Sequence, residues 1–197
     1  MSTYRTKSTT GRAMFRTVPL AFALLLAGCV VPVPIPIETP PKSFVVGYVY
    51  PDQPKPGAAP AASRCAAPAR ASAMAGALIA QVNAQRKAKG LGTLRPSAKL
   101  MKAAQGHACD NASRGGYSHV GSDGSDLSTR IRRTGYKIRV AAENTGLGFD
   151  DPARLVAFWM GSSGHRANML NPQVTEVGVG LADGARPSWV LNLAAGR

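Results

Sequence analysis

The chain has 197 residues, which allows one domain with appendages rather than two full domains. Hydrophobic residues make up 45% of it, enough to fill a core, and no apolar run reaches the roughly 18 residues of a membrane-spanning helix. A wholly disordered chain and a polytopic membrane protein are therefore excluded. The formal net charge is +14, but four of the 24 cations lie in the first 28 residues, so charge alone does not indicate nucleic-acid binding.

The N-terminus has the three parts of an export signal, namely a basic segment, a short apolar run and small residues. Its end, Leu26-Ala27-Gly28-Cys29, resembles the lipobox of bacterial lipoproteins, which implies cleavage before Cys29 and acylation of that residue. We expect residues 1–28 to be removed and the lipid to hold the mature chain on a membrane. Val30, not Asp, follows the cysteine, and by resemblance to Gram-negative lipoproteins this favours the outer membrane. A plain export signal with an incidental cysteine is the alternative.

Residues 29–70 read as a lipidated, proline-rich tether. Ten of the 15 prolines lie between residues 30 and 68, where they impair both helical and sheet hydrogen bonding. The strand-like segment 44–50 interrupts this tether. It is either a short added strand or a part of the linker that adheres through its apolar side chains.

The pattern changes in residues 71–197, for which we predict a single α+β domain. Apolar residues recur at helical spacing, with glycines at the ends, and predict four helices: from a cap at Ser72 to Gly90, from Ser97 to Gly115, over 127–134, and from a cap at Asp151 onward. Residues 177–181 and 189–193 alternate instead, as expected of a half-exposed hairpin around the turn 182–184. Helices followed by strands indicate a layered α+β fold.

Two cysteines remain once Cys29 is assigned to the lipid. In an exported protein Cys65 and Cys109 can form a disulfide, which would fasten the tether to the second helix, although Cys109 could equally be a small buried hydrophobic residue. A nucleophilic pair of His107 and Cys109 is unfavourable, because residues two apart on a helix do not face each other.

Two histidines and two glutamates remain after the other polar residues are explained. His107 falls on an apolar helix face and reads as a packed histidine, whereas His119 and His165 each follow a glycine signal in a predicted loop. Glu143 and Glu176 lie in strand-like sequence, where glutamate has poor β propensity and no capping role. Two imidazoles and two carboxylates suit a divalent cation, zinc above all.

Several ordered motifs resemble the CAP superfamily, also called the SCP-domain family of cysteine-rich secretory, antigen five and pathogenesis-related proteins. The resemblance spans residues 74–193 and rests on these motifs: Tyr117-Ser118-His119, Asp123-Gly124 leading to Arg130-Ile131, Gly135-Tyr136, Glu143-Asn144, Gly164-His165-Arg166-Ala167-Asn168 and Glu176-Val177-Gly178-Val179-Gly180. It implies a three-layer α-β-α sandwich whose central cleft is lined by His119, Glu143, His165 and Glu176, with Arg166 and Asn168 in structural roles. The eukaryotic cysteine framework is absent, and the last strand departs from the common pattern.

Function follows less directly than fold, because one fold hosts many activities. The leading hypothesis is a monomeric envelope lipoprotein that binds a divalent metal through direct histidine ligands, with the glutamates as ligands or outer partners, and engages a lipid, glycan or protein. The alternative is a metal-dependent hydrolase of the envelope, a peptidase or cell-wall enzyme, in which one glutamate acts as base. Residues 71–197 carry 16 cations and 8 acids, which also favours contact with anionic lipid or an envelope polymer, but not nucleic acid after export. If no metal is bound, a buried cluster of these two histidines and two glutamates would instead hold the histidines protonated, as ion pairs.

Overall fold

The computed structural model describes residues 45–46 and 65–197, so the predicted signal peptide, Cys29 and most of the predicted tether lie outside the described part. Within that part the helices are α1 (Ala71–Lys87), α2 (Ala98–Ser113), α3 (Leu127–Arg133), α4 (Pro152–Gly161) and α5 (Ser163–Met169). The strands are β1 (Val45–Val46), β2 (Arg95–Pro96), β3 (Ile138–Leu147), β4 (Glu176–Ala182) and β5 (Ser188–Gly196). A search of the described helices finds none that could cross a membrane.

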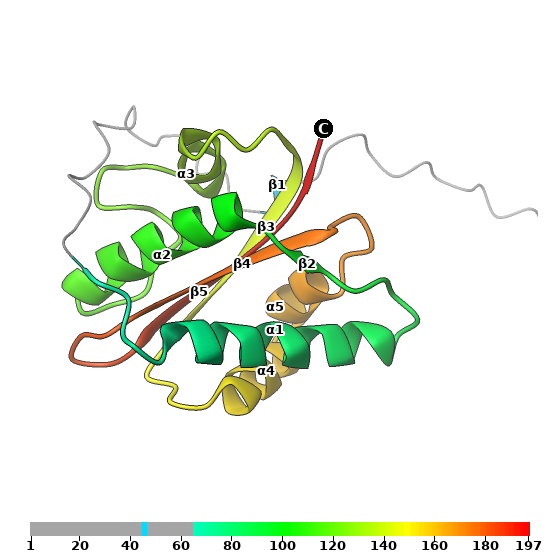
Figure 1. The fold of residues 1–197 in the computed structure, drawn as a ribbon, viewed down its shortest axis with the longest axis horizontal. Coiled ribbons are helices and arrows are strands. Elements are labelled where there is room, and N and C mark those ends of the chain that lie inside the picture. The colour runs from blue at the N-terminus through cyan, green and yellow to red at the C-terminus, as the bar shows by residue number, and fades with distance from the viewer. Residues whose placement is uncertain (1–44, 47–64) are drawn as a thin grey trace, which may run out of the picture. The chain divides into compact units, whose positions relative to one another are not determined.

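The strands form one sheet in the order β1-β3-β5-β4-β2, with the long strands β3, β5 and β4 antiparallel at its centre. Helices cover both faces, α2 and α3 on one and α1, α4 and α5 on the other (Figure 1). The predicted three-layer α-β-α sandwich is therefore confirmed. The largest apolar cluster lies between the sheet and the α1/α4/α5 layer and includes Leu78, Leu155, Trp159 and Trp189.

Helix starts follow the predicted caps in two cases. The Asp126 carboxylate accepts a hydrogen bond from Thr129 N at 2.7 Å, and that of Asp151 accepts one from Ala153 N at 2.8 Å. The cap predicted at Ser72 is wrong. Ala71 N already donates to Pro68 O at 2.8 Å, and this turn starts α1 two residues earlier, with Arg70 in the cap position.

The predicted half-exposed hairpin is also wrong, because β4 and β5 lie inside the sheet and bury both faces. On the α2 face β4 carries Gly178 and Gly180, and the helix backbone packs directly on them. A Cβ at Gly178 would lie 2.2 Å from Leu100 C, and one at Gly180 would lie 2.3 Å from Ala104 C. Small residues here let α2 approach closely, which a hydrophobic alternation cannot predict.

The strand-like segment within the tether contributes β1. Val45 and Val46 pair in parallel with Ala141 and Ala142 at the edge of β3. Of the two alternatives open from the sequence, the structure therefore favours a short added strand.

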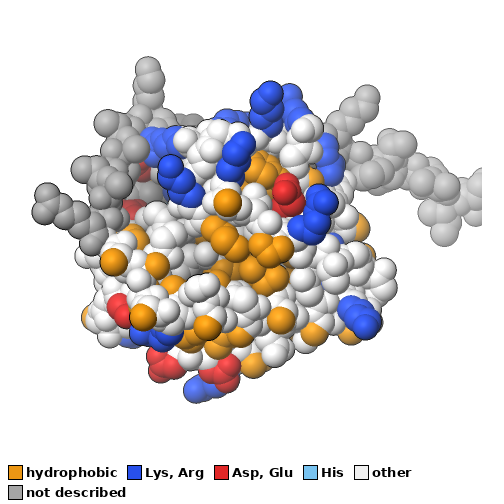
Figure 2. Space-filling view, in the orientation of Figure 1, with side chains coloured by type: hydrophobic (Ala, Val, Ile, Leu, Met, Phe, Trp, Pro, Cys, Tyr) orange, Lys and Arg blue, Asp and Glu red, His pale blue; other side chains and the backbone are white. Residues whose placement is uncertain are grey.

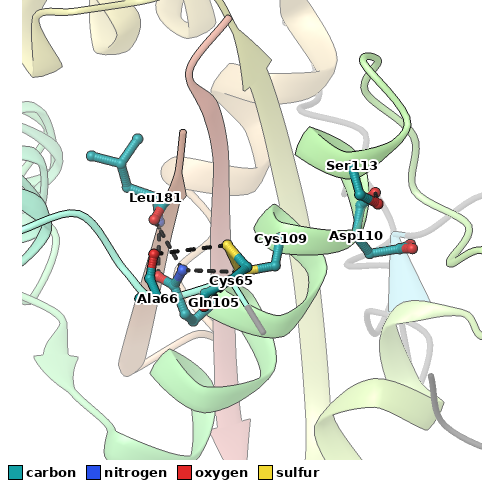
Figure 3. The surroundings of a disulfide bond; sticks show 7 residues. All are labelled: Cys65, Ala66, Gln105, Cys109, Asp110, Ser113 and Leu181. Atoms are coloured by element: carbon teal, nitrogen blue, oxygen red, sulfur yellow. Dashed lines mark hydrogen bonds between the residues drawn. A yellow bond between two sulfur atoms is a disulfide. The ribbon is translucent and has the colours of Figure 1, made fainter. Parts of the chain in front are cut away.

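A disulfide joins Cys65 to Cys109 of α2, with 5.7 Å between their Cα atoms and 44 residues between them in sequence (Figure 3). The predicted bridge is thus present. Beside it the Gln105 amide donates to Leu181 O at 2.9 Å and accepts from Leu181 N at 3.1 Å, so it binds the edge of β4. Arg70 forms an ion pair with Asp183 in the β4–β5 turn. The residues before α1 are therefore fastened to the α2 face and to the turn.

Candidate functional site

Glu143 lies in the middle of β3 with its side chain towards α2, opposite Asn192 of β5. It is 3% exposed, although the sequence placed it only in strand-like surroundings near a strand end. Its Oε1 lies 2.9 Å from Nδ1 of His119, which is in the connection between α2 and α3. The structure therefore brings two of the four predicted site residues into direct contact.

Arg130 of α3 holds this pair in place. Its Nη2 donates to Glu143 Oε2 at 2.8 Å, and its Nη1 donates to the main-chain oxygen of His119 at 2.9 Å. The side chain of Asn192, with its amide oriented to satisfy its neighbours, also donates to Glu143 Oε2 at 3.1 Å. Arg130, which belongs to one of the motifs that resemble the CAP superfamily, is only 8% exposed, so its charge lies inside the domain.

These contacts keep Glu143 ionised despite its burial. Burial alone would raise the pKa of its carboxyl, but the Arg130 guanidinium, the hydrogen bond from His119 and the nearby His107 lower that pKa to about 2. Both carboxylate oxygens are engaged with protein donors. Glu143 is therefore a fixed negative charge whose contacts orient its neighbours.

His107 borders the same cluster from α2. Its Nε2 lies 2.7 Å from Ser118 O, so the predicted hydrogen-bonded packed histidine is confirmed. It also lies 3.9 Å from Glu143 Oε1, a neighbour that the helix pattern did not reveal. Burial lowers the pKa of His107 more than Glu143 raises it, so the ring is held neutral.

His165 is on α5 and not in the loop predicted from its glycine signal, because a one-residue break at Ser162 starts a new helix. Two buried residues of β3 hold this helix: Asn144 Nδ2 donates to His165 O, and Asn168 Nδ2 donates to Glu143 O, both at 3.1 Å. The structural role implied for Asn168 is therefore present. The main-chain oxygen of Glu143 thus accepts a hydrogen bond from α5, the helix that carries His165.

The ring of His165 has a buried Nδ1 without a hydrogen-bond partner. The pKa of His165 is lowered by burial and, second, by the electrostatic effect of His119. The protonated histidines expected of a metal-free cluster with two carboxylates stay a prediction, because only one carboxylate, that of Glu143, contacts a site histidine.

Within the described residues, no hydrogen bond or ion pair joins Glu176, or the ring of His165, to the His119–Glu143 pair. The Glu176 carboxylate accepts a hydrogen bond from the hydroxyl of Tyr136, and its backbone lies opposite Ala194, two residues along β5 from the partner of Glu143. Two strand spacings and two residues separate the glutamate backbones by roughly 12 Å. Within the described ranges no group of three or more His, Cys, Asp or Glu side chains is arranged to hold a metal ion.

Two exposed aromatic residues flank the histidines. Tyr117 (69% exposed) precedes His119 by two residues, and the ring centroid of Phe158 (53% exposed) lies 6.2 Å from that of His165. Phe149 packs against Phe158 with 5.2 Å between ring centroids. Tyr117 and Phe158 are the only strongly exposed large hydrophobic residues in the described part of the chain.

Each of the two imidazoles has one feature of a metal ligand. Nδ1 of His119 is engaged by a carboxylate, as in metal-ligating histidines whose second nitrogen binds the metal, and His165 carries the unpartnered buried nitrogen. Glu143 fits as the outer partner of His119 and not as a ligand. Two protein ligands would leave coordination positions for water or for a bound molecule.

Comparison with known proteins finds a match to the family model "CAP: Cysteine-rich secretory protein family" over residues 79–193. The protein YkwD of Bacillus subtilis is 31% identical over 117 residues, 59% of this chain and 46% of that protein. The membrane protein YlbC of the same organism is 30% identical over 99 residues, 50% of this chain and 29% of that protein. The chain thus spans less than half the length of these relatives.

Solved structures agree on the fold. An extracellular protein containing an SCP domain from Bacillus anthracis superposes with a TM-score of 0.59 at 26% identity, covering 63% of this chain and 41% of that one. A cysteine-rich secretory protein from Staphylococcus aureus gives a TM-score of 0.55 at 23% identity, covering 65% and 40%.

Proposed function

Since the chain belongs to the CAP family, with a family match over residues 79–193, we propose that it is an envelope lipoprotein whose His119 and His165 bind one divalent metal ion. The observation that carries this proposal is the positioned His119. Its Nδ1 is held by the buried Glu143, which is itself held by Arg130, so its other nitrogen is left for a metal. When bound, the metal supplies a Lewis-acidic centre with open positions for an anionic or carbonyl group.

The surroundings favour an organic ligand with an apolar face. Tyr117 and Phe158 are the exposed aromatic residues, one beside each histidine, and aromatic faces bind sugar rings, acyl chains and peptide side chains. A ligand that gives one donor to the metal and one apolar face to these rings would use both features.

The proposed location rests on the N-terminal sequence and on the relatives. Cys29 ends an export signal with the lipobox order, and one structural relative is described as extracellular while a curated relative is described as a membrane protein. We place the domain outside the cytoplasm, held by lipid on Cys29, on the outer membrane where there are two membranes. Mass spectrometry of the N-terminal peptide tests this, and an unmodified mature chain that starts elsewhere would contradict it.

Binding is favoured over hydrolysis by the state of the glutamates. A general base needs a free carboxylate oxygen near its substrate, but both oxygens of Glu143 accept hydrogen bonds from protein groups. Glu176, in turn, is bonded to Tyr136. We therefore do not propose the hydrolase alternative further.

The metal proposal is tested by zinc titration of the mature chain at pH 7.5. We expect one zinc ion per chain, loss of binding in the His119→Ala, His165→Ala double variant, and a 10- to 100-fold weaker affinity in Glu143→Gln, since outer partners contribute about that much. Glu176→Gln is the matched control and should bind zinc like the wild type.

Two results would contradict the proposal. One is the absence of zinc binding and of any zinc-dependent rise in melting temperature in the wild type. The other is a double variant that binds zinc as tightly as the wild type. If Glu176→Gln loses as much zinc affinity as Glu143→Gln, Glu176 would be shown to take part in the metal site.

A further inference from the structure

Five exposed cations gather at one end of the sheet. They come from β2, the first turn of α2, α3, the residue before β3 and β3 itself, and they are Arg95, Lys99, Arg132, Lys137 and Arg139. Figure 2 shows Lys and Arg side chains along the upper part of the drawn face, towards the end of the sheet that carries the C-terminus in Figure 1. We call these five residues the basic end.

Specific contacts join these elements. Lys99 Nζ donates to Gly135 O at 3.0 Å, which links the start of α2 to the end of α3. Arg139 Nη2 donates to Gln173 O at 3.0 Å, which links the start of β3 to the turn before β4. Arg95 pairs in β2 with the start of β4, and the start of β4 and the start of β3 lie at the same end of the sheet. The five cations therefore come from neighbouring elements at one end of the sheet.

Within the described residues, the charge of the basic end is not neutralised by direct ion pairs, since none of the five cations pairs with a carboxylate there. Two described acids lie near this end, and each is bonded to another residue: Glu176 to Tyr136, and Asp123 to Arg133 of α3. By contrast, Arg70, Arg114 and Arg130 elsewhere each have a carboxylate partner.

The strand β1 begins at the same end. Because β1 pairs with β3 in parallel, with Val45 opposite Ala141, the first residue of β1 lies beside the start of β3, where Arg139 lies. Only 15 residues separate Cys29 from Val45. Even fully extended as polyproline, that length spans no more than about 50 Å.

From these observations we propose that the basic end is a membrane-docking surface, which binds anionic phospholipid headgroups and orients the domain on the bilayer that carries its anchor. The proposal rests on the lipid anchor at Cys29. A membrane is favoured over a soluble polymer because the anchor keeps a lipid surface within reach of this end at high effective concentration. Exposed Lys and Arg side chains near an anionic lipid surface each strengthen partitioning, by about five-fold per residue.

The test uses the mature chain, residues 29–197, with Cys29→Ser, so that no acyl chain contributes. Partitioning is measured by co-sedimentation with vesicles of phosphatidylcholine alone and with added phosphatidylglycerol, in low salt and in 0.5 M salt, about the point where exposed charges are screened. We expect binding only to the anionic vesicles, lost in high salt. The Lys99→Gln, Lys137→Gln, Arg139→Gln variant should bind about 100-fold more weakly.

The matched control removes the same charge elsewhere. Lys87, Lys89 and Arg154 are exposed on α1, after α1 and on α4, and their replacement by Gln should leave vesicle binding nearly unchanged. An equal loss in both variants would show attraction by net charge alone and overturn the proposal. Two other results would also overturn the proposal. One is that the chain does not bind anionic vesicles. The other is that the basic-end variant loses binding to dextran sulfate but not to vesicles.

The two proposals fail separately. Because the vesicle assay uses an unacylated chain, its failure leaves the lipid on Cys29 intact. An unmodified Cys29 in cells, with vesicle binding retained by the isolated chain, would remove the anchor but leave the basic surface. The melting temperature of the control variant should match that of the wild type, because its three positions are exposed. The basic-end variant loses the exposed bonds from Lys99 to Gly135 O and from Arg139 to Gln173 O, so its melting temperature should fall slightly while it stays folded.

Discussion

The two faces of the central sheet are buried to a similar degree but in different ways. The face towards α1, α4 and α5 is covered by large apolar side chains, among them Leu78, Leu155 and Trp159. The face towards α2 and α3 has glycines and alanines where the helix packs and a buried polar cluster of His107, Arg130, Glu143 and Asn192. The first face provides most of the hydrophobic stabilisation, and the second positions the candidate site.

This difference shows how one small domain combines stability with a charged interior. A buried ion pair contributes little net stability, because desolvation opposes its Coulombic attraction. The large apolar core on the opposite face therefore supplies the stability that the polar cluster does not. Close approach of α2, permitted by Gly178 and Gly180, keeps the polar face compact.

The largest effect we expect comes from Glu143→Gln. The substitution leaves the buried Arg130 guanidinium without its negative partner, which should lower the free energy of unfolding by about 3–5 kcal/mol. Glu176→Gln on the same face is the control. Its carboxylate is only partly buried and accepts one bond from Tyr136, so we expect a loss of about 1 kcal/mol. Urea denaturation of both variants measures the difference, and equal losses would show that the two glutamates are equivalent.

Much of the fold could be predicted from the sequence. Helical spacing and the capping residues Asp126 and Asp151 located two helices closely, and the ordered motifs indicated the three layers. The strand β3 was indicated only as strand-like sequence around Glu143, without bounds, because Ala141 and Ala142 have weak β propensity and its sheet partners are distant in sequence. The burial of β3 depends on the strands and helices that pack against it, not on the hydrophobic pattern of its own sequence.

The site could be predicted only in part. His119, Glu143 and His165 were identified as residue types, but the sequence could not show that Arg130 binds Glu143 or that Glu176 turns to Tyr136. These contacts depend on the register between β3, β5 and β4, a tertiary feature. The one available signal for Arg130 was an isolated apolar neighbour, Ile131, on a short helix.

Loss of the disulfide should have the next largest effect. The Cys65→Ser, Cys109→Ser variant releases a loop of 44 residues, which corresponds to about 4 kcal/mol on the chain-entropy model. Reductant should lower the melting temperature of the wild type and leave that of the variant unchanged. If both thiols of the freshly isolated wild type react with an alkylating agent before reduction, the bridge is absent in the natural protein.

A smaller effect is expected at the α2 contact. Gly180→Ala would place a methyl group 2.3 Å from the backbone of Ala104, so that helix and strand must separate, at a cost of about 1–3 kcal/mol. Gly76→Ala, at an exposed position of α1, is the matched control, since nothing lies within 4 Å of its added Cβ. There the better helix propensity of alanine should stabilise by about 0.5–1 kcal/mol. Melting temperatures should therefore shift in opposite directions, and shifts of the same sign would contradict close packing of α2.

The smallest effect concerns pH and the buried His107. Burial lowers the pKa of this imidazole in the folded state, although Glu143 and Asp110, each with an oxygen 3.9 Å from the ring, act to raise it, and Arg130 adds to the lowering. The unfolded chain then binds more protons below the ordinary histidine pKa of about 6.5, so stability falls as pH drops from there through the folded pKa. We expect the wild type to lose melting temperature between pH 7 and pH 5. His107→Gln, which can still bond to Ser118 O, should show a flatter profile over that range. A wild-type profile that rises on acidification would mean that the polar cluster holds His107 charged, and the comparison between the two faces would then have to include a second buried cation on the α2 side.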